Sequence, residues 1–167
     1  MRRAAVMCAG TGAVILPAAG ASLVSGPLGL ARLLVLGGAL GLLVPYDLRE
    51  HRIPNRIVLP AACVCAALSL AEGVQQGAGL YLGATLVAAL FAVSLAAPAA
   101  LGMGDAKLAL LILCALGGLA SLALLIAVEL YCLAGVALLI RHGRAAFKIT
   151  LPLAPVIAAG CLITVLL

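Results

Sequence analysis

The chain has very few charged residues for its length. Only 9% of its 167 residues are Asp, Glu, Lys or Arg, and tryptophan is absent. A soluble domain carries roughly 25% charged residues, so this chain cannot make an ordinary water-facing surface. Its mean hydropathy of +1.35 instead indicates a polytopic membrane protein. No polar stretch is long enough for a separate soluble domain, so we expect residues 1–167 to form a single integral-membrane domain.

Patterns typical of several common function classes are also missing. None of the six cysteines belongs to a Cys-x-x-Cys pair, and all lie in apolar stretches, so we interpret them as small buried side chains. We therefore expect no metal site and no disulfide framework. The net charge of +5 comes from basic residues at the ends of apolar segments, which is a topology signal rather than a nucleic-acid-binding surface.

Seven apolar segments are candidates for membrane-spanning helices, since one crossing takes about 20 residues. Charges, glycines and prolines separate them, and two of the boundaries are weak. The expected fold is therefore all-α, a polytopic membrane bundle of six or seven transmembrane helices. The candidate spans are 5–24, 27–46, 56–72, 78–98, 106–120, 121–140 and 152–167.

The basic residues predict the orientation of the bundle. With seven spans and a cytoplasmic N-terminus, nine of the ten Lys and Arg side chains fall on the cytoplasmic side, and only Arg32 falls on the other. The first segment, which follows Arg2 and Arg3, is then a retained span rather than a cleaved signal peptide. In this arrangement Asp47 and Asp105 lie on the same, cytoplasmic, side.

These two aspartates are the main candidates for chemistry. Only five residues of the chain are acidic, and these two lie in short motifs, 45–55 and 102–108, at the ends of apolar segments. A carboxylate at membrane depth is costly, which makes it a candidate functional group. Two carboxylates that meet can share a proton and activate water, which is the mechanism of aspartic proteases. Asp47 and Asp105 are therefore the predicted catalytic pair.

Each motif taken alone also has a plain structural explanation. Gly102 and Gly104 are typical of a loop, and Asp105 would then cap the following helix. Asp47 would be the interfacial end of a helix, and Asn55 a plausible N-cap of the next one. The functional interpretation assigns Gly102 and Gly104 to substrate binding, because a glycine backbone lets an extended peptide pass close to the catalytic carboxylate.

Taken together, the ordered motifs resemble those of the type IV prepilin peptidases. The shared pattern is Asp47 followed by a basic loop and Ile-Pro-Asn at 53–55, then one helical hairpin, then Gly-x-Gly-Asp-x-Lys at 102–107. A proline-containing segment, 151–155, precedes the last span, and the resemblance covers about residues 30–167. It implies a membrane aspartic endopeptidase with Asp47 and Asp105 as the catalytic pair and no cofactor.

The resemblance also implies a substrate and a location. The enzyme would remove a short basic leader from prepilin-like precursors, after a glycine, at the cytoplasmic face of a prokaryotic inner membrane. Its partners would be that membrane protein and the lipid bilayer, with no nucleic acid. The cysteine-containing N-terminal segment of the long family members is lacking, so the chain resembles the short form associated with tight-adherence (Flp-type) pili, and N-methylation is left open. Presenilin-like proteases share Gly-x-Gly-Asp, but their Pro-Ala-Leu motif is absent.

Two alternatives from other classes stay open. A small proton-coupled transporter would use Asp47, Asp105 and Glu129 as a relay. A non-catalytic scaffold of a pilus or secretion system would tolerate substitution of both aspartates. We expect Glu129, near the middle of a span, to be a hydrogen-bonded structural group, with lining of the substrate path or direct chemistry as alternatives. Lys107 is interpreted as a positive-inside anchor, with an electrostatic effect on Asp105 as the alternative.

Overall fold

The chain forms a helical bundle in the computed structural model, which describes residues 26–50, 53–73, 78–97, 102–143 and 152–167. Every regular element in these ranges is helical, which confirms the all-α class. The predicted span 5–24 lies outside the described residues. The elements are α2 (Pro27–Glu50), α3 (Asn55–Glu72), α4 (Ala78–Ala96), α5 (Met103–Leu116), the short 3-10 helix η1 (Gly117–Leu119), α6 (Ala120–His142) and α7 (Ala154–Leu166).

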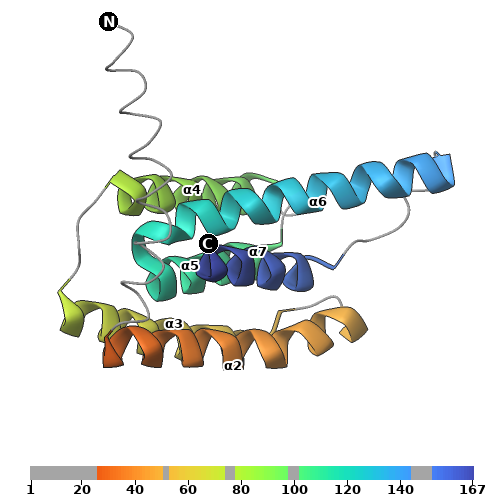
Figure 1. Ribbon diagram of the computed structural model, residues 1–167. Helices are drawn as coiled ribbons and strands as arrows, with labels where there is room; N and C mark the ends of the chain where they lie inside the picture. Colours follow the sequence, from red (N-terminus) through yellow and green to blue (C-terminus); the bar gives the residue numbers. More distant parts are fainter. Residues whose placement is uncertain (1–25, 51–52, 74–77, 98–101, 144–151) are drawn as a thin grey trace, which may run out of the picture.

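Successive helices run in opposite directions along the bundle (Figure 1). Short connections favour this arrangement, because they leave neighbouring helices antiparallel. The ends of α2, α4 and α6 therefore lie at the same end of the bundle as the beginnings of α3, α5 and α7. We call this the aspartate end, because Asp47 and Asp105 both belong to it.

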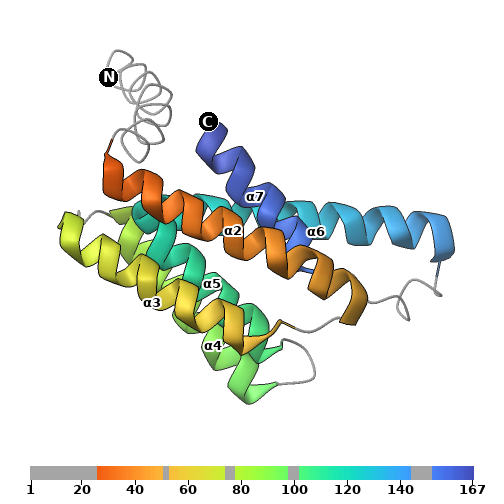
Figure 2. The ribbon, with the colours of Figure 1, turned by 90° about the horizontal axis from the view of Figure 1, so that it is seen from below.

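Four helical stretches are long and apolar enough to cross a membrane: Pro27–Glu50, Asn55–Glu72, Ala78–Ala96 and Met103–His142. The last stretch contains a reversal, since Gly117 adopts a φ of 56° and α6 runs back beside α5 (Figures 1 and 2). The helix α7 is shorter than a usual crossing. The described part of the chain thus supports a membrane protein, but it does not confirm the predicted six or seven spans.

The helix α5 forms the centre of the bundle. It packs against α3 on one side and α4 on the other, and α2 and α6 also contact it (Figure 2). Half of its fourteen residues are buried, among them Leu108, Leu111, Ile112 and Leu116. In a lipid solvent this close packing stabilises the bundle mainly through dispersion and shape. The helix that carries Asp105 is therefore held firmly in place.

Glycines allow the closest helix contacts, as expected for membrane helices rich in small residues. A Cβ atom at Gly160 of α7 would lie 2.8 Å from the carbonyl oxygen of Ala123 in α6. A Cβ atom at Gly79 of α4 would lie 2.4 Å from the carbonyl oxygen of Gly118 in η1. Any larger side chain at these positions would push the helices apart, so both glycines fix the spacing of α4, α6 and α7.

The described basic residues are distributed as predicted, with only Arg32 away from the others. Arg49 lies at the end of α2, Arg56 at the start of α3, Lys107 at the start of α5 and Arg141 at the end of α6, all at the aspartate end. Arg32 lies toward the opposite end. Four of the five described Lys and Arg residues therefore lie at the aspartate end of the bundle.

Candidate active site

Asp47 lies inside a helix rather than in a loop. The predicted span ended at residue 46, but α2 continues past Pro45 to Glu50. This extension places Asp47 in the last turns of α2, where its side chain is only 6% exposed. A buried carboxylate needs a hydrogen-bonding partner, because an unpaired buried charge is strongly unfavourable.

The partner of Asp47 is the first turn of α7. The backbone N–H of Ala154 donates a hydrogen bond to Oδ2 of Asp47 at 2.9 Å, and both groups are buried. The first N–H groups of a helix have no partner inside the helix, and a negative charge is favourable beside them. Pro155 comes next and has no N–H to offer. Asp47 thus caps a helix that begins 107 residues later in the chain.

Asp105 is held by its own helix terminus. It is the third residue of α5, whose N-cap is Gly102. The backbone N–H of Asp105 donates a hydrogen bond to the carbonyl oxygen of Gly102 at 3.0 Å. A carboxylate in the first turn is favoured by the positive end of the helix dipole. That the Asp105 carboxylate accepts an amide hydrogen bond stays a prediction.

A cavity of about 360 Å³ joins the two aspartates at one end of the bundle. It brings together all four residues that the sequence singled out for the site. Two carboxyl groups that meet in one site favour a shared proton over full ionisation of both. The lining residues are Asp47, Ile53, Asn55, Gly102, Met103, Gly104, Asp105 and Lys107.

The two glycines of the motif have different surroundings. A Cβ atom at Gly104 would lie 2.9 Å from Cβ of Ile53, which is closer than real Cβ atoms approach. A Cβ atom at Gly102 would meet only Oδ2 of Asp105, at an ordinary 3.5 Å. Gly104 is therefore needed so that the segment before α3 can pack against the start of α5. Gly102 is exposed and borders the open side of the cavity.

The expected N-cap role of Asn55 is wrong. The N-cap of α3 is Pro54, and no side chain caps this helix. Asn55 is the first residue of α3, and its Oδ1 accepts a hydrogen bond from Nζ of Lys107 at 3.0 Å. This contact links the starts of α3 and α5 across the cavity wall. Within the described residues, no ion pair joins Lys107 to either aspartate.

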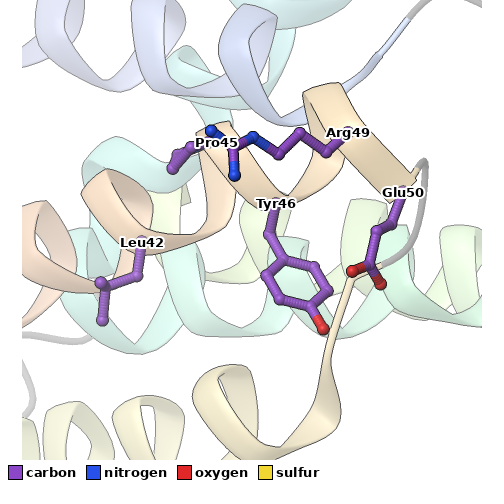
Figure 3. Close-up of a pocket in the computed structure, with 5 residues that line it drawn as sticks. All are labelled: Leu42, Pro45, Tyr46, Arg49 and Glu50. Carbon is purple, nitrogen blue, oxygen red and sulfur yellow. The ribbon is translucent and has the colours of Figure 1, made fainter.

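A second hollow, of about 220 Å³, lies on the surface of α2 (Figure 3). Leu42, Tyr46 and Glu50 extend to one side of the helix, while Arg49 lies back toward Pro45. All five lining residues come from this one helix. The hollow brings no distant groups together, so the cavity with both aspartates is the better candidate for chemistry.

Glu129 is not the internally hydrogen-bonded group that its position predicted. Its side chain is exposed on α6, and it forms no hydrogen bond or ion pair with any residue that the structure describes. It also lies far along the bundle from the aspartate cavity, whose lining does not include it. The structure therefore gives it no part in the site.

The fold and the site define a class: an all-helical membrane protein with two carboxylates facing one cavity at an end of the bundle. The chain belongs to the type IV leader peptidase family, whose model matches residues 33–140. The matched stretch contains Asp47, Asp105 and the helices between them, and it confirms the predicted family. Searches of curated proteins and of solved structures gave no match. The helix α7, which supplies the Ala154 N–H, lies beyond the matched residues.

Proposed function

We propose that this protein is an aspartic endopeptidase that removes the short basic leader from prepilin-like precursors. Membership of the type IV leader peptidase family supports a peptidase of this general kind. The observation that carries the proposal is the cavity, into which separate helices bring Asp47 and Asp105 together. Two carboxylates in one water-accessible cavity are the equipment that an aspartic protease needs.

The reaction uses the pair as one base and one acid. The ionised carboxylate takes a proton from water, and the water oxygen adds to the scissile carbonyl carbon. The protonated carboxyl gives its proton to the carbonyl oxygen. The tetrahedral intermediate then collapses and the C–N bond breaks. The leaving amine takes the proton that the first carboxylate removed from water, and a hydroxyl group of the intermediate returns a proton to the second carboxylate. Because one group must be ionised and the other protonated, the rate should fall at both low and high pH.

The substrate would reach the site along the exposed backbone at Gly102. An extended peptide is usually held through main-chain hydrogen bonds, which require close approach to an open backbone. Gly104 is covered by Ile53, so of the two predicted substrate-binding glycines Gly102 is the better candidate for direct contact. The proposed location is a prokaryotic inner membrane with the aspartate end in the cytoplasm, because the basic residues lie at that end.

The test is co-expression with a candidate Flp-type prepilin, with leader removal followed by gel shift and mass spectrometry. The wild type should cleave after a glycine. Asp47→Asn and Asp105→Asn should each lower the rate by about a thousandfold or more, the scale seen when a member of a catalytic unit is removed. Near-normal cleavage by either variant would overturn the catalytic pair.

A non-catalytic scaffold is the second candidate, because the hydrogen bond to Ala154 gives Asp47 a structural role. The two functions separate with a pair of variants. Asn at position 47 keeps an oxygen that can accept the Ala154 N–H, whereas Ala does not. The protease predicts that both variants lose cleavage. A scaffold predicts that Asp47→Asn behaves as wild type in assembly of the pilus system and that only Asp47→Ala fails.

A further inference from the structure

The described residues leave the second half of α6 almost uncovered. The buried residues of this helix all lie between Ala120 and Ala127, and none of the residues from Val128 to His142 is buried. Figures 1 and 2 both show the C-terminal end of α6 extending beyond the other helices. A membrane helix can face lipid, so exposure of apolar side chains here needs no explanation by itself.

Glu129 is the feature that lipid does not explain. It lies near the middle of α6, its side chain is exposed, and no described residue forms a hydrogen bond or ion pair with it. Carboxyl groups within membrane helices almost always face protein or water, because burial in hydrocarbon without a partner is costly. The exposed face of α6 therefore calls for a covering surface that can hydrogen-bond a carboxyl group.

The exposed residues around Glu129 form a regular seam. Five of them recur at alternating intervals of four and three along α6, and all five are exposed. This is the spacing at which two helices pack along their length in a left-handed pair. A single polar residue at such a seam sets the register and the number of helices. The seam residues are Leu125, Glu129, Cys132, Val136 and Leu139.

We propose that the α6 seam is a dimer interface that a second copy of this chain covers, with the Glu129 side chains of the two copies hydrogen-bonded to each other. Copies of one protein share the same orientation in a membrane. A twofold axis along the membrane normal makes their α6 helices parallel and brings each seam residue to its own counterpart at the same depth. A carboxyl group suits this symmetry, because it can both donate and accept a hydrogen bond when protonated.

A Lys or Arg side chain at position 129 would have no hydrogen-bond acceptor to offer its counterpart, whereas a carboxyl group has one, so the chemistry of Glu129 is compatible with self-association. The neighbouring seam residues Leu125, Cys132 and Val136 are compact or apolar and would pack against their own copies. The inference does not rest on the proposed peptidase activity, since the seam contains none of the residues that line the aspartate cavity.

The native Cys132 provides the first test, because it lies in the seam and is a free, exposed thiol. Oxidation of the full-length protein in membranes should give a covalent dimer on a non-reducing gel. The dimer should disappear in Cys132→Ser and persist in Cys63→Ser, which removes a matched exposed thiol on α3. A dimer that survives Cys132→Ser undiminished would overturn the proposal.

The seam geometry is tested in the Cys132→Ser background. Val136→Cys should restore the covalent dimer, because position 136 belongs to the seam. Ala137→Cys should not, although Ala137 is equally exposed, because it lies about 100° around the helix. Equal cross-linking at the two positions would indicate random collision and would contradict the interface.

The role of Glu129 is tested by two substitutions with Cys132 intact. Glu129→Gln keeps the hydrogen-bonding capacity and should keep the dimer. Glu129→Leu should lower the cross-linked fraction about fivefold, the effect expected for losing one polar contact between membrane helices. Both variants should insert and stay monodisperse in detergent, since Glu129 is exposed and forms no hydrogen bond or ion pair with a described residue. If Cys132 cross-links to a co-expressed prepilin and not to itself, the surface binds substrate and the dimer is wrong.

Discussion

The two ends of the bundle differ in how their charged side chains are paired. At the aspartate end, Asp47 and Asp105 face a cavity, and no cation is paired with either of them in the described residues. At the other end, Arg32 near the start of α2 forms an ion pair with Glu72 at the end of α3. The antiparallel arrangement of α2 and α3 brings these two residues together.

This difference separates structural charges from candidate functional ones. The ion pair compensates the buried charge of Arg32 with the more exposed carboxylate of Glu72 and links two helices. Two carboxyl groups without a cationic partner beside one cavity lower the stability of the fold. Such groups are typical of sites that do chemistry. The comparison therefore predicts that mutations at the aspartate end mainly lower cleavage activity. Mutations at the Arg32–Glu72 end should mainly lower the free energy of unfolding.

The largest stability effect is expected at the ion pair. Glu72→Met leaves the buried guanidinium of Arg32 without its partner and should lower the free energy of unfolding by about 3 kcal/mol, since removing the partner of a buried charge strands that charge. Thermal unfolding in detergent measures this. Cleavage per folded molecule should stay within about twofold of wild type, because the pair is distant from the cavity.

The matched control for this prediction is the double variant Arg32→Met/Glu72→Met. It removes both charges and should recover a large part of the lost stability. A comparable fall in cleavage by folded Glu72→Met would contradict the comparison, because it would give the Arg32–Glu72 end a part in the reaction.

The next effect concerns the two glycines at the aspartate end. Gly104→Ala forces a Cβ against Ile53 and should displace the start of α5, with a loss of about 2 kcal/mol in stability. A displaced Asp105 should also slow cleavage on the order of tenfold to a hundredfold. Unfolding and cleavage assays on the same preparation measure both quantities.

Gly102→Ala serves as the control for Gly104→Ala. Its Cβ would make only an ordinary contact with Asp105, so stability should change by less than about 0.5 kcal/mol. If the substrate backbone passes over Gly102, the added methyl group should raise KM more than it lowers kcat. Equal stability losses in the two variants would show that the close contact with Ile53 is not what requires glycine at position 104.

The smallest effect is expected at the contact between Asn55 and Lys107. Asn55→Ala removes an exposed hydrogen bond and should lower stability by about 0.5 kcal/mol. Lys107→Met should have a similar effect, and the double variant should lose little more than either single one, since both remove the same contact. A double-mutant cycle of unfolding free energies tests this. Full additivity would mean that the two residues act independently.

Much of the class and site could be predicted from local pattern. Composition alone indicates a membrane protein, because too few polar residues are present to face water. The motifs around Asp47 and Asp105 lie at helix ends, and alternating helices bring those ends to one side of the bundle. The sequence could not place α7, because its hydrogen bond to Asp47 joins residues 107 apart. A hint lay in Pro152 and Pro155, which mark the start of a helix.

Other contacts were missed for the same reason. Arg32 was predicted only as the single basic residue on the outer side, yet it is buried against Glu72. Asn55 was predicted as a helix cap, but its side chain contacts Lys107 on another helix. In each case the residue type indicated a polar contact, but the partner could not be predicted, because a partner from a different helix has no fixed spacing in the sequence.

By itself the sequence determined that this is a helical membrane protein with two aspartate motifs, because these features depend on composition and on residues close together in the chain. Only the tertiary structure decided that α7 supplies a hydrogen-bond donor to Asp47, that Ile53 requires glycine at position 104, and that Glu129 lies on an uncovered face. These features depend on how whole helices pack, and packing is set by shapes and distances that no local pattern encodes.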